Sequence, residues 1–224
     1  MNERVRTVLF MIVITAVATA VMTGAQVLLR PTIVLNEEAR LMRGRLQGLD
    51  LLPEGADAAA VARIYKEQVE LIEIEGRELF LGYDKDGTLK SVGMTFRGPA
   101  FWGPVSGVLS LDPDLKQIAG LAFLQQQETP GLGGRIMEPW FTDQFKGKQA
   151  EKPDESGRYL QFLPEGVAAT QPNQVDGISG ATRTTDSVNR IVNNELKEFH
   201  AVADKIPHHR QNKGRSTDTQ GGGK

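Results

Sequence analysis

The sequence has no cysteine among its 224 residues and only three histidines. Without thiols, a disulfide framework, a thiolate nucleophile and cysteine-ligated zinc or iron–sulfur centres are excluded. The histidines are His200, His208 and His209, so a histidine metal site or histidine acid–base chemistry is excluded from the first 199 residues. Any redox chemistry would therefore have to come from a bound cofactor.

Two common phosphate-binding loops are also absent, because the sequence contains neither GxxxxGK[ST] nor a GxGxxG that follows a strand. Positive charge is scarce in the body of the chain, where residues 31–204 hold 26 acidic and 18 basic residues. An acidic body is a poor nucleic-acid binder. The length, with 40% hydrophobic and 24% charged residues, suits one globular domain with accessory segments.

The N-terminal segment contains the longest apolar run. Residues 7–29 carry no charge and would span roughly 34 Å as a helix, enough to cross a membrane. Ala16, Ala20 and Gly24 form a stripe of small residues that could pack on another membrane helix. The alternative is a signal peptide cleaved after "ATA" at 18–20. The run is longer than a typical signal-peptide core and continues past that site, which favours a retained anchor. The short tail before the run fits a single anchor with the body outside the cytoplasm.

The remaining pattern predicts an α+β fold, with an N-terminal transmembrane helix followed by a mostly antiparallel sheet flanked by helices. Asp57 is the predicted N-cap of the second connector helix. The predicted elements are helices at 36–49, 58–72, 139–147 and 185–202, hairpins at 78–96 and 106–125, and short strands at 158–163 and 166–170. The predicted organisation is a cytoplasmic tip and anchor (1–30), a helical connector (31–75), the main domain (76–203) and a disordered basic tail (204–224).

Two glycine-rich stretches do not fit a core pattern. In "RGPAFWGPVSG" (97–107), glycines and prolines surround Phe101 and Trp102, so we expect a loop rather than regular structure. The pair either plugs the core or offers an aromatic to a planar ligand. In "QQQETPGLGGRI" (125–136), glycine lets the backbone approach a ligand closely. There, Leu132 could cover a flat ring and Glu128 could bond a heterocycle; the alternative is an ordinary tight loop.

A third stretch, "DGISGATRTTDS" (176–187), holds five hydroxyls and small residues directly before a helical pattern. One interpretation is a helix N-cap made by Thr184, Thr185 or Ser187. The other is phosphate capture, in which free N–H groups at the helix start bind an anion that Gly180 and Ala181 allow to come close. Composition and spacing indicate a phosphate-bearing ligand with a flat ring system.

Together these stretches resemble the FMN-binding domain family, whose pattern is Asp-x-x-Ser/Thr-Gly-Ala-Thr. Residues 176–182 match it in full, and both the "ETPGLGG" loop (128–134) and the Gly-x-x-x-Trp-Gly-Pro segment (98–104) agree. Within the family, the chain is most similar to the C subunit of Na⁺-translocating NADH:quinone oxidoreductases and the G subunit of Rnf complexes. The loop wording favours the first and the modest length favours the second.

The resemblance implies FMN bound by a phosphoester to Thr182, attached by a flavin transferase outside the cytoplasm. It gives Asp176 a role in orienting the phosphate; the alternative is a turn-forming aspartate. No residue is expected to be catalytic and none to bind a resident metal. The expected cofactor contacts are Asp176, Ser179, Gly180, Ala181, Thr184, Glu128, Thr129, Gly131, Leu132, Gly133 and Trp102.

The implied function is a membrane-anchored flavoprotein subunit that relays electrons within an Rnf/Nqr-type ion-translocating complex. Its expected partners are the other membrane subunits, the flavin transferase and membrane lipid. Its expected location is a bacterial or archaeal cytoplasmic membrane, crossed once, with the body on the outer side. One alternative is a stand-alone extracytoplasmic flavin carrier or reductase. Another is a module that binds a phosphorylated small molecule without a covalent bond.

Overall fold

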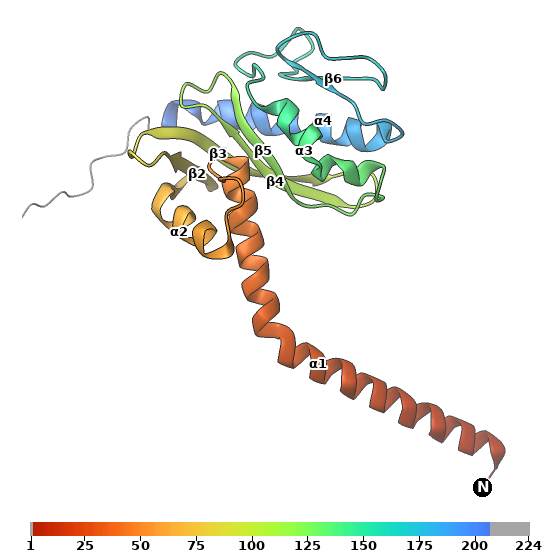
Figure 1. The fold of residues 1–224 in the computed structure, drawn as a ribbon. Helices are drawn as coiled ribbons and strands as arrows, with labels where there is room; N and C mark the ends of the chain where they lie inside the picture. Colours follow the sequence, from red (N-terminus) through yellow and green to blue (C-terminus); the bar gives the residue numbers. More distant parts are fainter. Residues whose placement is uncertain (1, 207–224) are drawn as a thin grey trace, which may run out of the picture. The chain divides into compact units, whose positions relative to one another are not determined.

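The structure is a computed structural model that describes residues 2–206 (Figure 1). It divides into two compact units, Met1–Arg40 and Leu41–Lys224, which are described separately below. Most of the predicted basic tail lies outside the described residues. The tail's first residues belong to a short 3₁₀ turn, η3 (Ala203–Lys205), and Ile206 is buried.

The first unit consists of the N-terminal part of helix α1 (Glu3–Gly48). Its segment Glu3–Arg30 is long and apolar enough to cross a membrane, and its apolar side chains are exposed. The sequence predicted two helices, at 7–29 and 36–49, but the structure has one continuous helix through Gly48. Residues 30–35, which separate the two predicted helices, contain no glycine that would end a helix.

The second unit is built on a five-stranded antiparallel sheet, whose strands lie in the order in which they follow one another in the sequence. The two predicted hairpins are confirmed, and with them the predicted α+β class. The strands are β1 (Val69–Ile74), β2 (Arg77–Tyr83), β3 (Leu89–Pro99), β4 (Pro104–Leu111) and β5 (Ile118–Gln125).

Helix α2 (Ala58–Gln68) precedes the sheet, and the prediction of its start is confirmed. The Asp57 carboxylate accepts a hydrogen bond of 2.7 Å from the Ala60 N–H, which otherwise has no partner within the helix. The prediction that this helix continues to residue 72 is wrong. Residues 69–74 instead pair with β2, because "VELIEI" contains three β-branched residues, which favour strands, and β2 is available beside it.

One face of the sheet is lined by small residues, and residues 41–49 pack closely against it. The Ser91 and Ser110 hydroxyls donate to the carbonyls of Leu49 (2.8 Å) and Gly48 (2.6 Å). A Cβ at Gly120 would lie 2.6 Å from the Gly48 carbonyl oxygen, so glycine is needed for this close approach of the backbones. Satisfied buried hydroxyls and small residues thus let the helix backbone lie directly on the strands.

The opposite face carries the main hydrophobic core, which is covered by helix α4 (Thr182–Ala201), shown in blue in Figure 1. A Cβ at Gly98 would lie 2.5 Å from the Ile191 side chain, which shows how closely α4 approaches β3. The predicted apolar stripe of this helix is confirmed, because all of its members are buried: Val188, Ile191, Val192, Leu196 and Phe199.

Short elements connect the large sheet to α4. They are η1 (Gly133–Met137), α3 (Pro139–Thr142), η2 (Asp143–Phe145) and two parallel strands, β6 (Gln161–Leu163) and β7 (Gln174–Asp176). The helix predicted at 139–147 is shorter than expected, although Pro139 does begin it. The strand predicted at 166–170 is wrong. Side-chain oxygens of Asp176 and Gln174 accept from backbone N–H groups of residues 169–171, so these groups are not available to a neighbouring strand.

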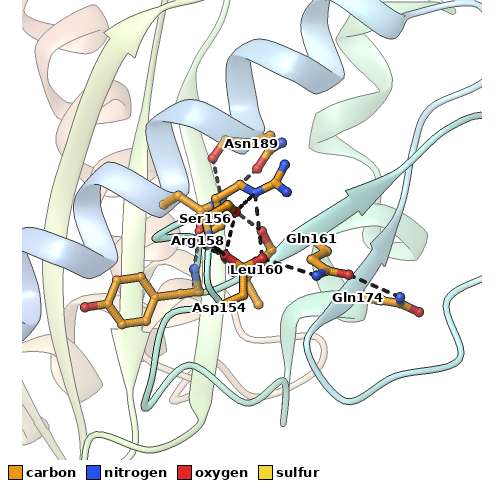
Figure 2. A network of polar contacts seen from close by, with 9 residues as sticks. Asp154, Ser156, Arg158, Leu160, Gln161, Gln174 and Asn189 are labelled. Carbon is orange, nitrogen blue, oxygen red and sulfur yellow. Dashed lines mark hydrogen bonds and ion pairs between the residues drawn. The ribbon is translucent and has the colours of Figure 1, made fainter.

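A polar network fixes the segment that leads to β6 (Figure 2). Asp154 accepts from the Ser156 hydroxyl (2.6 Å), from the Arg158 N–H (3.0 Å) and from the Gln161 amide (3.2 Å). The Ser156 hydroxyl, together with the other donors, holds the pKa of Asp154 well below its usual range. Gln161 also accepts from Gln174 at 3.3 Å. The network therefore connects β6 to β7, immediately before the stretch of residues 176–187.

Candidate functional site

The three stretches that the sequence singled out meet at one place in the second unit. They are the turn between β3 and β4, the loop that follows β5, and the start of α4. Between them is a hollow of about 360 Å³, within the range of roughly 300–1,000 Å³ typical of small-molecule sites. It is lined by Phe101, Trp102, Glu128, Thr129, Leu132, Gly133, Gly180, Ala181, Thr182, Arg183 and Thr184.

The first wall is the β3–β4 turn, closed by a 3.0 Å hydrogen bond from the Ala100 N–H to the Gly103 carbonyl. The prediction that residues 97–107 are irregular is wrong at both ends, because the strands continue to Pro99 and resume at Pro104. Phe101 is 43% and Trp102 64% exposed, which excludes the alternative that the pair plugs the core. Their ring centroids lie 5.0 Å apart, so they form one aromatic surface at the hollow.

The second wall is the loop between Glu128 and Gly134. Gly131 has a φ of +76°, which glycine adopts freely, and the N–H groups of Leu132 and Gly134 both donate to the Thr129 carbonyl. This tight turn leaves the Leu132 side chain 45% exposed. Leu132 also lies beside the third wall, because a Cβ at Gly180 would be 3.1 Å from its Cδ2 atom.

The third wall is the first turn of α4, which begins at Thr182, three residues earlier than predicted. Ala181 is the N-cap and makes no side-chain capping bond, so the prediction that Thr184, Thr185 or Ser187 caps this helix is wrong. The Thr185 Oγ1 accepts from the Ile178 N–H at 3.2 Å instead, and the Ser187 hydroxyl donates to the Arg183 carbonyl. The N–H groups of this first turn are therefore free of a side-chain cap.

Thr182 itself is exposed and stands at the N-terminal end of the helix, where the positive end of the helix dipole lies. Gly180 precedes it with a φ of +71°, a conformation in which a Cβ would be strained. The Arg183 guanidinium carbon lies 5.0 Å from the Phe101 ring centroid, a cation–π distance. An accessible hydroxyl, uncapped N–H groups and a guanidinium are thus combined at one end of the hollow.

Glu128 lines the hollow but is almost completely buried, at only 4% exposure. Its Oε1 accepts from the Trp102 N–H at 2.9 Å, and its Oε2 accepts from the Thr184 hydroxyl at 2.6 Å. Thr184 is itself 3% exposed. One buried carboxylate therefore joins all three walls.

Three of the predicted contact residues do not line the hollow. Asp176, at the end of β7, accepts from the Ala169 N–H at 2.5 Å. The Ser179 hydroxyl donates to Glu165, which also accepts from the Gly180 N–H at 3.1 Å. These two donors hold the pKa of Glu165 below its usual value, the Ser179 hydroxyl contributing most. The third residue is Gly131, which forms the turn.

Sequence reasoning missed two lining residues and one neighbour. Phe101 was signalled by its place beside Trp102, and Arg183 by its positive charge directly after Thr182, which suits a phosphate. Glu165 carried no signal, because its bonds to Ser179 and Gly180 join segments that only the tertiary structure brings together.

The comparison with known families agrees with this geometry. Residues 100–197 match the FMN-binding domain, and every residue that lines the hollow falls within that range. Residues 100–197 are therefore similar to the FMN-binding domain, and the resemblance predicted from the sequence is confirmed.

More particularly, the chain is similar to proteins named as the C subunit of Na⁺-translocating NADH-quinone reductase. That of Pasteurella multocida is 29% identical over 164 residues, which cover 69% of this chain and 62% of the relative. That of Neisseria meningitidis serogroup A is 31% identical over 138 residues, covering 60% and 52%. The chain thus matches between half and two thirds of the length of these relatives.

Solved structures show the same fold. The crystal structure of the Na⁺-translocating NADH-quinone reductase C subunit from Parabacteroides distasonis superposes with a TM-score of 0.65 at 26% identity, covering 80% of this chain and 98% of that one. NqrC of Shewanella oneidensis gives a TM-score of 0.65 at 21% identity, covering 75% and 97%. The mostly antiparallel sheet with flanking helices is therefore shared with both.

Proposed function

We propose that this chain holds FMN in the hollow through a phosphoester to Thr182 and relays electrons as one component of a membrane oxidoreductase complex. One observation supports this most strongly. An exposed threonine stands at the uncapped start of a helix, in a hollow walled by two exposed aromatic rings. The match to the FMN-binding domain supports the identity of the ligand.

The phosphate end of the ligand would lie at Thr182. The first-turn N–H groups of α4 would donate to phosphate oxygens, and Arg183 would neutralise their charge. Attachment forms a bond between the Thr182 oxygen and the FMN phosphorus and breaks a phosphoanhydride in an activated flavin dinucleotide, so that a nucleoside monophosphate leaves. The hydroxyl proton leaves to a base of the flavin transferase. Thr182 is thus an attachment point and not a catalyst.

The ring end would lie against the other two walls. Leu132 offers an apolar side chain beside Thr129, and Trp102 offers an aromatic face. FMN, when bound, supplies one- and two-electron redox chemistry. The protein's residues hold the cofactor in place, and a phosphoester keeps it from dissociating. Such permanence suits a relay between fixed carriers better than the turnover of a diffusing substrate.

The apolar segment Glu3–Arg30 would anchor the chain in a membrane, with residues 76–203 on the outer side. The named relatives are C subunits of a Na⁺-translocating reductase, which supports membership of a complex of that kind, with other membrane subunits as partners. A stand-alone extracytoplasmic carrier is the alternative. Gentle extraction from native membranes separates the two proposals. Co-purification with polytopic subunits supports the complex, and a chain that purifies alone supports the carrier.

The covalent bond is tested by making the full chain together with a flavin transferase and examining it on a denaturing gel. The parent and Thr182→Ser, which keeps a hydroxyl, should give a fluorescent band, and Thr182→Ala should give none. Ser187→Ala is the matched control, since it removes a nearby hydroxyl that bonds only within α4. A fluorescent band that persists in Thr182→Ala contradicts attachment at this residue.

A further inference from the structure

Glu128 is the most deeply buried carboxylate at the site, and both of its oxygens are occupied by protein donors. The Trp102 N–H and the Thr184 hydroxyl point at it from two different walls, 2.9 and 2.6 Å away. Glu128 itself belongs to the remaining wall. A single side chain therefore connects the β3–β4 turn, the glycine-rich loop and the first turn of α4.

The packing around this carboxylate allows little adjustment. A Cβ at Gly133 would collide with the Thr184 hydroxyl oxygen and would lie 2.9 Å from the Glu128 Oε2. The glycine at this position is therefore required by the carboxylate–hydroxyl pair and not by a positive φ.

We propose that Glu128 is a positioning residue, which fixes the spacing between the aromatic wall and Thr182 and does not itself contact the flavin. The inference rests on the proposed function, because the spacing matters only if a ligand is attached at Thr182 and lies against Trp102. It differs from the direct bond to the flavin ring that the sequence suggested for Glu128. The geometry favours positioning, because Glu128 is only 4% exposed and its two oxygens accept bonds from two different walls, which holds these walls together.

Two substitutions of Glu128 separate the effect of its hydrogen bonds from the effect of its negative charge. In Glu128→Gln, the amide oxygen can still accept from the Trp102 N–H, and the NH₂ group can donate to the Thr184 hydroxyl, which accepts as well as donates. Glutamine therefore keeps the connection and removes the charge. Alanine removes both and leaves two buried donors without a partner.

The experiment uses the full chain in detergent, made with the flavin transferase, and two readouts. The first is the rate of flavin attachment, and the second is the visible circular dichroism of the attached flavin, which reports its protein surroundings. Glu128→Ala should slow attachment about tenfold or more, since small displacements of reacting groups have large effects on rate. Its dichroism should approach that of free FMN. Glu128→Gln should recover most of both readouts.

Thr184→Val gives an independent check, because it keeps the shape of the side chain and removes the hydroxyl that donates to Glu128. It should shift the dichroism in the same direction as Glu128→Ala, while Ser187→Ala should leave it at the parent value. If Glu128→Ala does not fold, the Thr184→Val and Ser187→Ala pair decides the question.

Three results overturn the inference: equal losses in Glu128→Gln and Glu128→Ala, parent-like dichroism in Glu128→Ala, or parent-like dichroism in Thr184→Val. These failures differ from a failure of the proposed function. In that case, the parent chain itself would carry no attached flavin.

Discussion

Replacing Glu195 with glutamine should remove much of the pH dependence of this protein's stability between pH 4.5 and 7. Glu195 lies on α4, and its Oε1 is buried without a hydrogen-bond partner among the described residues. Burial raises the pKa of this carboxyl to about 7; the Arg77 charge opposes the rise, and the Glu198 charge adds to it. Arg77 is itself paired with Glu198 at 2.6 Å.

The size of the effect follows from the shift. One pKa unit corresponds to about 1.4 kcal/mol, so a rise from 4.5 to about 7 corresponds to about 3 kcal/mol. Below pH 4.5 the carboxyl is protonated in the folded and unfolded chain alike, and stability is complete. As pH rises toward 7, the unfolded chain releases its proton first, and the folded state loses up to that amount of stability.

The assay is urea unfolding of the full chain in detergent at several pH values, followed by tryptophan fluorescence. Both tryptophans, Trp102 and Trp140, belong to the second unit, so the signal reports on its unfolding. The stability difference between Glu195→Gln and the parent should change by about 3 kcal/mol from pH 4.5 to pH 8, in favour of the variant. Glu155→Gln, at an exposed loop position, is the control. A difference that stays constant across this range would refute the reasoning.

Two further predictions, one on packing beside the site and one on a buried polar contact of α4, use the same unfolding assay. Gly133→Ala should cost about 1–3 kcal/mol, because the new methyl collides with the Thr184 hydroxyl oxygen. Gly134→Ala, whose methyl would come no closer than 3.2 Å to its neighbours, should cost less, and equal losses would contradict this explanation. Asn193→Ala should cost about 3 kcal/mol, since the backbone N–H groups of residues 159 and 160 both donate to its buried oxygen. A loss below about 1 kcal/mol would show that these groups find other partners.

Local chemistry allowed much of the fold to be predicted from the sequence. Alternating strands bounded by turn residues identified β2 to β5, and a helical apolar stripe identified the buried face of α4. The carboxylate of Asp57 marked the start of α2. In each of these cases, the pattern and the interaction that stabilises it lie within a few residues of each other.

The predictions were wrong where the local structure depends on a contact with a residue that is distant in the sequence. The segment 69–74 is a strand because β2 is available to pair with it, and its own residues also fit a helix. Thr184 does not cap its own helix because its hydroxyl donates to Glu128, 56 residues away. Trp102 is exposed in the turn between β3 and β4, which the glycines and prolines around it did not reveal.

For the same reason, the site was predicted as a set of segments rather than as an arrangement. The motifs identified which three stretches would meet, and the match to the FMN-binding domain confirmed the resemblance. The motifs could not show that Glu128 is enclosed by protein donors. Nor could they show that the helix starts at Thr182 itself, which places the proposed attachment hydroxyl in the first turn of the helix.

The most direct test of covalent attachment is tandem mass spectrometry of the full chain purified after expression with a flavin transferase. We predict an intact mass increased by one FMN, less the water lost in ester formation, with the added mass on Thr182 in the peptide that contains residues 176–187. The same spectrum shows whether the N-terminal apolar segment is retained. An unmodified chain, or an FMN adduct on any other residue, would contradict the central claim.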